Sequence, residues 1–141
     1  MTEGRPQTVS QDFPGTLEAA EQAEAWLARQ SGALGLAPDA EFAINLCVEE
    51  LFLNAVRHGR ANRAQISISS ESSGVRLEFV DDGAPFDPAA APVRRIRDRS
   101  EDFQIGGYGT GLLQKFSRRI SYSRDAGQNR LVLEIDASAG R

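Results

Sequence analysis

The order of apolar periods along the chain restricts the folds that this sequence can form. Two stretches come first, at about 16–31 and 38–58, in which apolar residues recur every three or four positions. Each therefore predicts a helix with a buried face. Apolar and polar residues then alternate at 65–69 and 75–82, which predicts two adjacent antiparallel strands joined by a tight link. Two helices and a strand pair of this kind favour a sheet that is covered by helices.

The remaining segments extend this sheet. A short strand is expected at 7–13, a short third helix at 110–119, and a final hairpin with strands at 120–123 and 130–136. The chain is therefore predicted to be an α+β protein. Its expected architecture is a two-layer α/β sandwich in which about three helices cover one face of a mostly antiparallel sheet of about five strands.

Composition limits the setting in which the protein works. The length of 141 residues suits one domain, expected to span 1–141, and the one cysteine excludes an intrachain disulfide framework. The N-terminus lacks the apolar core of a signal peptide and no stretch is apolar enough to span a membrane, so we expect a cytoplasmic protein without a membrane partner. The net charge of −4 argues against direct nucleic-acid binding as the main activity.

The second predicted helix contains the first chemical motif. Glu50, Asn54 and His58 are spaced four apart, so they lie along one stripe of an α-helix. An amide oxygen suits Mg²⁺, and a carboxylate one turn earlier can accept a proton from an attacking hydroxyl. Glu49 points about 100° away and is the weaker candidate for a base. The alternative is a polar stripe that faces solvent, with His58 favourable near the helix C-terminus.

The second motif, "VDDGAPFDP" at 80–88, follows directly after a predicted strand. Asp81 can accept a hydrogen bond from an exocyclic amine, while Gly83 lets a flat ring approach the backbone. The alternative is an ordinary Asp-Gly turn.

The third motif is "GGYGTGL" at 106–112, at the start of the expected third helix. Its glycines leave backbone N–H groups accessible at a helix N-terminus, so the stretch can cradle phosphates, with Thr110 as an added donor. It matches neither the dinucleotide-binding fingerprint nor a P-loop, and the alternative is a flexible linker. About 24 residues before it lack any period, which is typical of a functional or mobile loop.

In this order and spacing, the three motifs resemble the GHKL superfamily of ATP-binding domains, which have the Bergerat fold, over about residues 7–136. Within the superfamily the chain is most similar to the stand-alone anti-sigma-factor serine/threonine kinases. The resemblance implies that Glu50 is the general base, that Asn54 ligates Mg²⁺, and that Asp81 binds the adenine amino group with Gly83 beside the base.

The same resemblance assigns residues 84–106 to the ATP lid and places His58 near the nucleotide, without a distinct chemical role. It also implies a second glycine box around the phosphates of ATP. The residues of that box are Gly107, Tyr108, Gly109, Thr110, Gly111 and Leu112. One departure is that Pro85 replaces the second glycine of the superfamily's Asp-x-Gly-x-Gly box. Positive charge for the γ-phosphate is expected from a lid arginine (Arg94, Arg95, Arg97 or Arg99) or from Lys115.

For function, the resemblance implies transfer of the γ-phosphate of Mg·ATP to a serine or threonine of a STAS-type antagonist protein in a partner-switching pathway. It further implies a sigma factor as a second partner and a homodimer. Two alternatives stay open from the sequence: a nucleotide-dependent binding switch without kinase activity, and a histidine-kinase-like ATPase domain.

Overall fold

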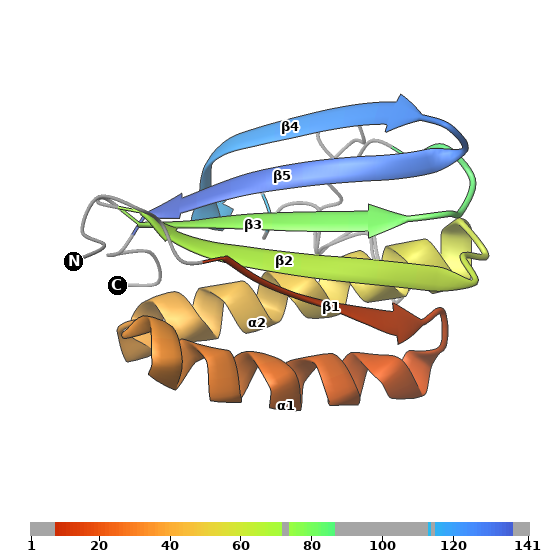
Figure 1. The fold of residues 1–141 in the computed structure, drawn as a ribbon. Coiled ribbons are helices and arrows are strands. Elements are labelled where there is room, and N and C mark those ends of the chain that lie inside the picture. The colour runs from red at the N-terminus through yellow and green to blue at the C-terminus, as the bar shows by residue number, and fades with distance from the viewer. Residues whose placement is uncertain (1–7, 72–73, 87–112, 114, 137–141) are drawn as a thin grey trace, which may run out of the picture.

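The computed structural model describes residues 8–71, 74–86, 113 and 115–136. Strand β1 (Thr8–Pro14) is followed by helices α1 (Leu17–Leu34) and α2 (Pro38–Leu53), a short π-helix η1 (Asn54–His58), and strands β2 (Arg63–Glu71), β3 (Gly74–Asp81), β4 (Ser117–Asp125) and β5 (Gln128–Asp136). The strands form one five-stranded sheet in the order β1-β2-β3-β5-β4, and every neighbouring pair is antiparallel. Helices α1 and α2 lie side by side on one face of the sheet (Figure 1). The predicted two-layer α/β architecture is confirmed.

Local signals set the limits of both helices. The side chain of Thr16 accepts a hydrogen bond from the backbone N–H of Ala19, which caps the start of α1. The helix ends where Gly35 adopts a left-handed φ of 71°. Pro38 occupies the first turn of α2, and two acidic residues follow it near the positive end of the helix dipole.

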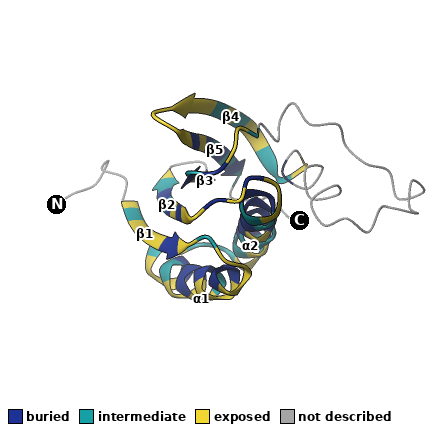
Figure 2. Ribbon diagram, turned by 90° about the vertical axis from the view of Figure 1, so that its right-hand side faces the viewer, coloured by how far each residue is buried: buried dark blue, intermediate teal, exposed yellow. Residues whose placement is uncertain are grey.

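The core lies between the helices and the sheet, where buried residues of both layers face each other (Figure 2). Three edge-to-face aromatic contacts join the layers. Phe13 of β1 contacts Trp26 of α1 and Phe52 of α2 with ring centroids 5.9 Å apart in each case, and Phe52 contacts Phe79 of β3 at 5.4 Å. Because Phe52 contacts Phe79, these aromatic contacts hold α2 against β3, the strand that leads into the second motif.

The expectation of about three helices was wrong in the described part of the chain, which contains two long helices. Within the expected helix at 110–119, residues 113, 115 and 116 are helical, whereas β4 already begins at Ser117. The basic run after Lys115 had a helical period, but pairing with β5 makes it a strand. Arg118 forms ion pairs there with Glu71, Glu134 and Asp136. Long-range strand pairing thus overrides local helix propensity.

The second predicted helix also changes character near its end. From Asn54 the backbone is π-helical, and the N–H of Gly59 donates to the carbonyl of Asn54 at 3.0 Å. Such single π-turns often occur at functional sites because they alter which side chains share a face.

Candidate functional site

The carboxylate of the first motif, on α2, and its amide, at the start of η1, are both buried. Glu50 is 6% exposed and Asn54 is 3% exposed, although both are polar. Within the described part of the chain, Oε2 of Glu50 and both Oδ1 and Nδ2 of Asn54 have no hydrogen-bond partner. Buried polar groups normally find partners, and leaving them without any costs free energy. Two such neighbours one turn apart indicate a site that is completed by a ligand.

Burial also changes the acidity of Glu50. Desolvation raises the pKa of its carboxyl from 4.5 to about 7. The adjacent Asn54 amide opposes this rise, although the two groups do not reach a well-formed hydrogen bond, and the charge of Glu49 adds to it. A carboxylate with a pKa near neutrality is suited to accept a proton in catalysis.

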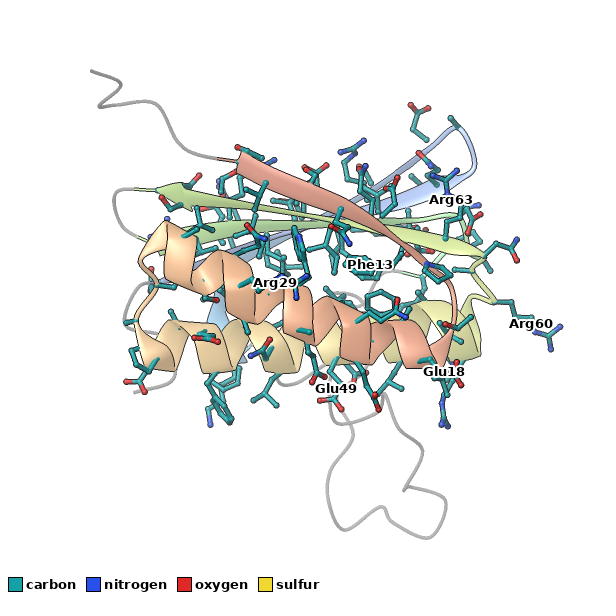
Figure 3. The ribbon with its side chains drawn as sticks, turned by 60° about the horizontal axis from the view of Figure 1, so that its bottom comes forward. Phe13, Glu18, Arg29, Glu49, Arg60 and Arg63 are labelled. Carbon is teal, nitrogen blue, oxygen red and sulfur yellow. The ribbon has the colours of Figure 1, made fainter. Side chains whose placement is uncertain are left out.

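Glu49 differs from Glu50 as the helical period predicts. It is exposed, and Figure 3 shows its side chain directed away from the core. It therefore stays outside the site, as expected from the sequence.

Asp81 and Gly83 meet at the end of β3. Oδ1 of Asp81 accepts hydrogen bonds from the N–H of Gly83 at 2.8 Å and from Nδ2 of Asn129 at 3.1 Å. Burial raises the pKa of Asp81, while the bonds from Asn129 and Gly83 oppose the rise, Asp82 adds to it, and Arg124 opposes it. Asp81 is 8% exposed, and these hydrogen bonds hold its carboxyl in a fixed orientation.

Close backbone packing explains the glycine at position 83. A Cβ on Gly83 would lie 2.9 Å from Oδ1 of Asp81 and 2.9 Å from the carbonyl oxygen of Gly59. That same carbonyl accepts a hydrogen bond from the N–H of Ala84 at 2.9 Å. The end of the π-helix and the end of β3 are therefore joined backbone to backbone.

A pocket opens between these two chain ends. Its cavity volume is about 20 Å³, far less than the roughly 300–1,000 Å³ of a typical small-molecule site, so the residues that the structure describes form only part of such a site. Apolar side chains form most of its walls, including Leu51, Phe79 and Leu131. Its polar groups include Asn54 and Asp81. A few polar groups in an apolar pocket suit a flat heteroaromatic ring.

Asn54 and His58 do not share the pocket, although an α-helical stripe predicted that they would lie together. Asn54 lines it, whereas His58 is exposed and stacks on Phe86 with ring centroids 6.0 Å apart and an interplanar angle of 17°. Phe86 itself lines the pocket. The π-turn changes the period after Asn54, and among the described residues His58 meets the site through Phe86.

The second glycine box and most of the expected lid lie outside the described residues. These are Gly107, Tyr108, Gly109, Thr110, Gly111, Leu112 and the segment 87–106 with its four arginines. Lys115 is described, and its Nζ lies 5.6 Å from the ring centroid of Phe116.

Sequence reasoning missed Asn129, Tyr122 and Gly59, which all line the pocket. One signal was present for Asn129. In the alternation of β5 it falls on the same face as Leu131 and Leu133, so it is a polar residue at a position that faces the core. Asn129 falls just before the strand predicted at 130–136 and was therefore not a candidate.

The site also permits a test of the expected Mg²⁺. No group of three or more His, Cys, Asp or Glu side chains in the described residues can hold a metal ion. Asn54 nevertheless offers a buried oxygen without a partner. Mg²⁺ often takes one or two protein ligands and shares the phosphate oxygens of its nucleotide, so the residues present fit a nucleotide-borne ion.

Comparison with known families agrees with this geometry. The model of the histidine kinase-like ATPase domain family matches residues 13–135, which include both helices and the sheet except most of β1 and the last residue of β5. The chain belongs to this family, and the resemblance to the GHKL superfamily is confirmed.

Individual relatives narrow the comparison. The serine/threonine-protein kinase BtrW of Bordetella bronchiseptica is 31% identical over 96 residues, which cover 65% of this chain and 68% of that protein. The fold is similar to the RsbU and RsbW domains of a Mycobacterium tuberculosis protein, with a TM-score of 0.60 and 16% identity over 92% of this chain and 32% of that one. It is also similar to a chain of the SiaB–SiaC complex of Pseudomonas aeruginosa, with a TM-score of 0.60 and 15% identity over 90% and 88% of the two chains.

A search of the described helices for a membrane span found none that is long and apolar enough.

Proposed function

We propose that this protein is an ATP-dependent serine/threonine kinase that phosphorylates a small partner protein. The observation that carries the proposal is the buried pair Glu50 and Asn54, which lie one helical turn apart. Oε2 of Glu50 and both polar side-chain atoms of Asn54 lack partners in the described structure, and Asn54 lines the same pocket as Asp81. Membership of an ATPase family and the similarity to BtrW support it.

The nucleotide would bind with its base in the pocket. Asp81 would accept a hydrogen bond from the exocyclic amine of adenine, and the apolar walls would contact the two faces of the ring. The amides of residues 107–112 would hold the phosphates, as the sequence predicts for a glycine-rich helix start. Mg²⁺ held by Asn54 would neutralise phosphate charge.

Glu50 would then serve the transfer step. Its carboxylate accepts the proton of the substrate hydroxyl as the oxygen forms a bond to the γ-phosphorus, and the bond from that phosphorus to the bridging oxygen of ADP breaks. A base with a pKa of about 7 is largely ionised above neutral pH, so the rate should rise as the pH increases through 7.

The partner assignments rest on the resemblance to anti-sigma-factor kinases. We propose a STAS-type antagonist as the substrate, a sigma factor as a second partner that is sequestered, and a homodimer as the assembly. The similarity in fold to a chain crystallised in the SiaB–SiaC complex is compatible with a protein partner.

A phosphotransfer assay tests the proposal. Purified protein is incubated with Mg²⁺, γ-labelled ATP and a cognate STAS protein, and wild type is compared with Glu50→Gln and Glu49→Gln. We expect the first variant to lose at least about 100-fold in rate while it keeps ATP affinity, because only the proton acceptor is removed. The exposed Glu49→Gln variant is the matched control and should transfer label like wild type.

ATP binding without label transfer to any cognate partner would instead favour a nucleotide-dependent binding switch. Equal transfer by wild type and Glu50→Gln would contradict the role of Glu50. Label found on His58 rather than on the partner would indicate histidine-kinase chemistry.

A further inference from the structure

Side chains of β4 and β5 form a hydrogen-bond network that fixes the carboxylate of Asp81. Strands β3 and β5 are neighbours in the sheet (Figure 1). Asn129 is 5% exposed and is the pairing partner of Asp81 across these strands. Its Nδ2 donates to Oδ1 of Asp81 at 3.1 Å and to the carbonyl of Ala84 at 2.9 Å, with a longer contact of 3.4 Å to the carbonyl of Gly83. Asn129 thus binds both the carboxylate and the backbone turn that follows it.

The orientation of the Asn129 amide is decided by its partners. Oδ1 of Asn129 accepts from the hydroxyl of Tyr122 at 2.6 Å and from the guanidinium of Arg124 at 3.0 Å. A guanidinium can only donate, and backbone carbonyls can only accept. The oxygen of the amide must therefore face β4, and its N–H groups must face Asp81.

Arg124 strengthens the same arrangement. Its guanidinium also donates to the carbonyl of Gly83 at 2.9 Å, so that carbonyl and Oδ1 of Asn129 share one cation. Hydrogen bonds from a charged donor are stronger than those between neutral groups. The turn after β3 is consequently held from β4 as well as from β5.

The consequence for Asp81 is that its two oxygens differ. Oδ1 is occupied by the N–H groups of Gly83 and Asn129, whereas Oδ2 has no hydrogen-bond partner among the described residues. One oxygen of the carboxylate is thus left to accept from a ligand. An amino group satisfies such an acceptor, while an oxo group at the same place would repel it.

We infer that Asn129, held by Tyr122 and Arg124, is a positioning residue that makes Asp81 selective for a 6-amino purine over a 6-oxo purine. This inference rests on the proposed nucleotide site and names how that site chooses its base. Without Asn129 the carboxyl would lose a donor that keeps it ionised and would be free to turn. As a carboxylate it could then accept a hydrogen bond from a 6-amino purine. As a protonated carboxyl it could donate one to a 6-oxo purine, so it would distinguish the two less well.

Affinities for ATP and inosine triphosphate test the inference, because the two nucleotides differ only at the 6-position and the adjoining ring nitrogen. Dissociation constants are measured by calorimetry for wild type, Asn129→Ala, Tyr122→Phe and Gln128→Ala. We expect wild type to prefer ATP by at least about tenfold, since a polar site rejects a ligand that leaves its groups unpaired.

Asn129→Ala should weaken ATP binding by about tenfold and inosine triphosphate binding far less, so that the preference shrinks. Tyr122→Phe keeps the shape of the pocket wall and removes one donor to Asn129, so the preference should shrink in the same direction by a smaller factor. Gln128 is exposed on the adjoining position of β5 and does not line the pocket, so Gln128→Ala should keep the wild-type preference.

The ratio of the two affinities separates positioning from a structural role. If Asn129→Ala does not fold, Tyr122→Phe decides by the same ratio. A preference that stays within about twofold of wild type in the folded variants overturns the inference, even where both affinities fall together. A wild type that binds both nucleotides equally also overturns it, and a wild type that binds neither overturns the proposed function as well.

Discussion

Two polar residues lower the stability of this protein because they are buried without hydrogen-bond partners for all of their polar atoms among the described residues. Glu50 is a buried carboxyl with an oxygen that has no partner in the described structure, and Asn54 beside it is in the same situation. Functional sites often retain such groups because the ligand, rather than the fold, satisfies them. The stability of the protein should therefore change when the Glu50 carboxyl is titrated or is replaced by a neutral group.

The raised pKa of Glu50 predicts how stability depends on pH. A pKa of about 7 in the folded protein and 4.5 in the unfolded chain means that the folded state binds this proton more tightly. The stabilising contribution is fully present below about pH 4.5 and is lost as the pH rises through 7. Glu50→Gln, which stays neutral, should thus be more stable than wild type at pH 8, by on the order of 2–3 kcal/mol, and about equal at pH 4.5.

Urea unfolding of both proteins, without nucleotide, at pH 4.5 and pH 8 measures this difference. Asp81 and Glu24 also have raised pKa values, but wild type and variant share them, so their effects cancel. The exposed Glu49→Gln serves as the control and should differ from wild type by no more than about 0.5 kcal/mol at either pH. A gap between wild type and Glu50→Gln that is the same at both pH values would contradict the buried, titrating carboxyl.

At the scale of elements, the site depends on where helix and strand ends meet. The π-turn at the end of α2 and the turn after β3 are joined by the hydrogen bond from Ala84 to Gly59. The two turns approach so closely that only a hydrogen atom fits at position 83. Movement of either element would separate Asn54 from Asp81.

A pair of glycine substitutions tests this close approach. Gly83→Ala should destabilise the protein by about 2 kcal/mol or more and weaken ATP binding, because its Cβ would meet the Gly59 carbonyl and Asp81 at 2.9 Å. Gly32 lies inside α1 with nothing within 4 Å of an added Cβ. Gly32→Ala should instead stabilise by about 0.5–1 kcal/mol, since alanine favours helix.

Thermal unfolding and ATP titration compare the two variants. Equal small effects from both substitutions would show that the approach of Gly59 and Gly83 is looser than the structure has it.

At the scale of the whole molecule, one aromatic layer aligns the two halves of the site. Phe52 is fully buried and contacts rings from both β1 and β3. In the sequence it is two residues from Glu50 of α2 and two from Asn54, the first residue of η1. The packing that stabilises the fold therefore also sets the position of α2 against the sheet.

Two phenylalanines of the same helix give a direct comparison. Phe52→Ala should destabilise the protein by about 3–5 kcal/mol, because it removes a buried ring and leaves a cavity. Phe42 is 59% exposed, so Phe42→Ala should change stability by no more than about 0.5 kcal/mol. Denaturant midpoints measure both, and a similar loss in the two variants would contradict the assigned core.

Periodicity predicted most elements, with differences at their ends. The starts of α1 near residue 16 and of α2 at residue 38 were expected, and all five strands occur at or around the predicted ranges. The third helix was overestimated because residues 117–119 pair with β5, a contact far away in the chain. The π-turn was missed because an i→i+4 and an i→i+5 helix share the same local sequence preferences.

The sequence by itself determined the fold class, the two long helices and the candidates Glu50, Asn54, Asp81 and Gly83, because these depend on local spacing and residue chemistry. Only the tertiary structure decided that Glu50 is buried with a pKa near 7, that His58 stacks on Phe86 at the pocket, and that Asn129 holds Asp81. Those features arise where β3, β5 and the end of α2 meet. Their physical reason is desolvation and hydrogen bonding between segments that are distant in the chain, which no local pattern records.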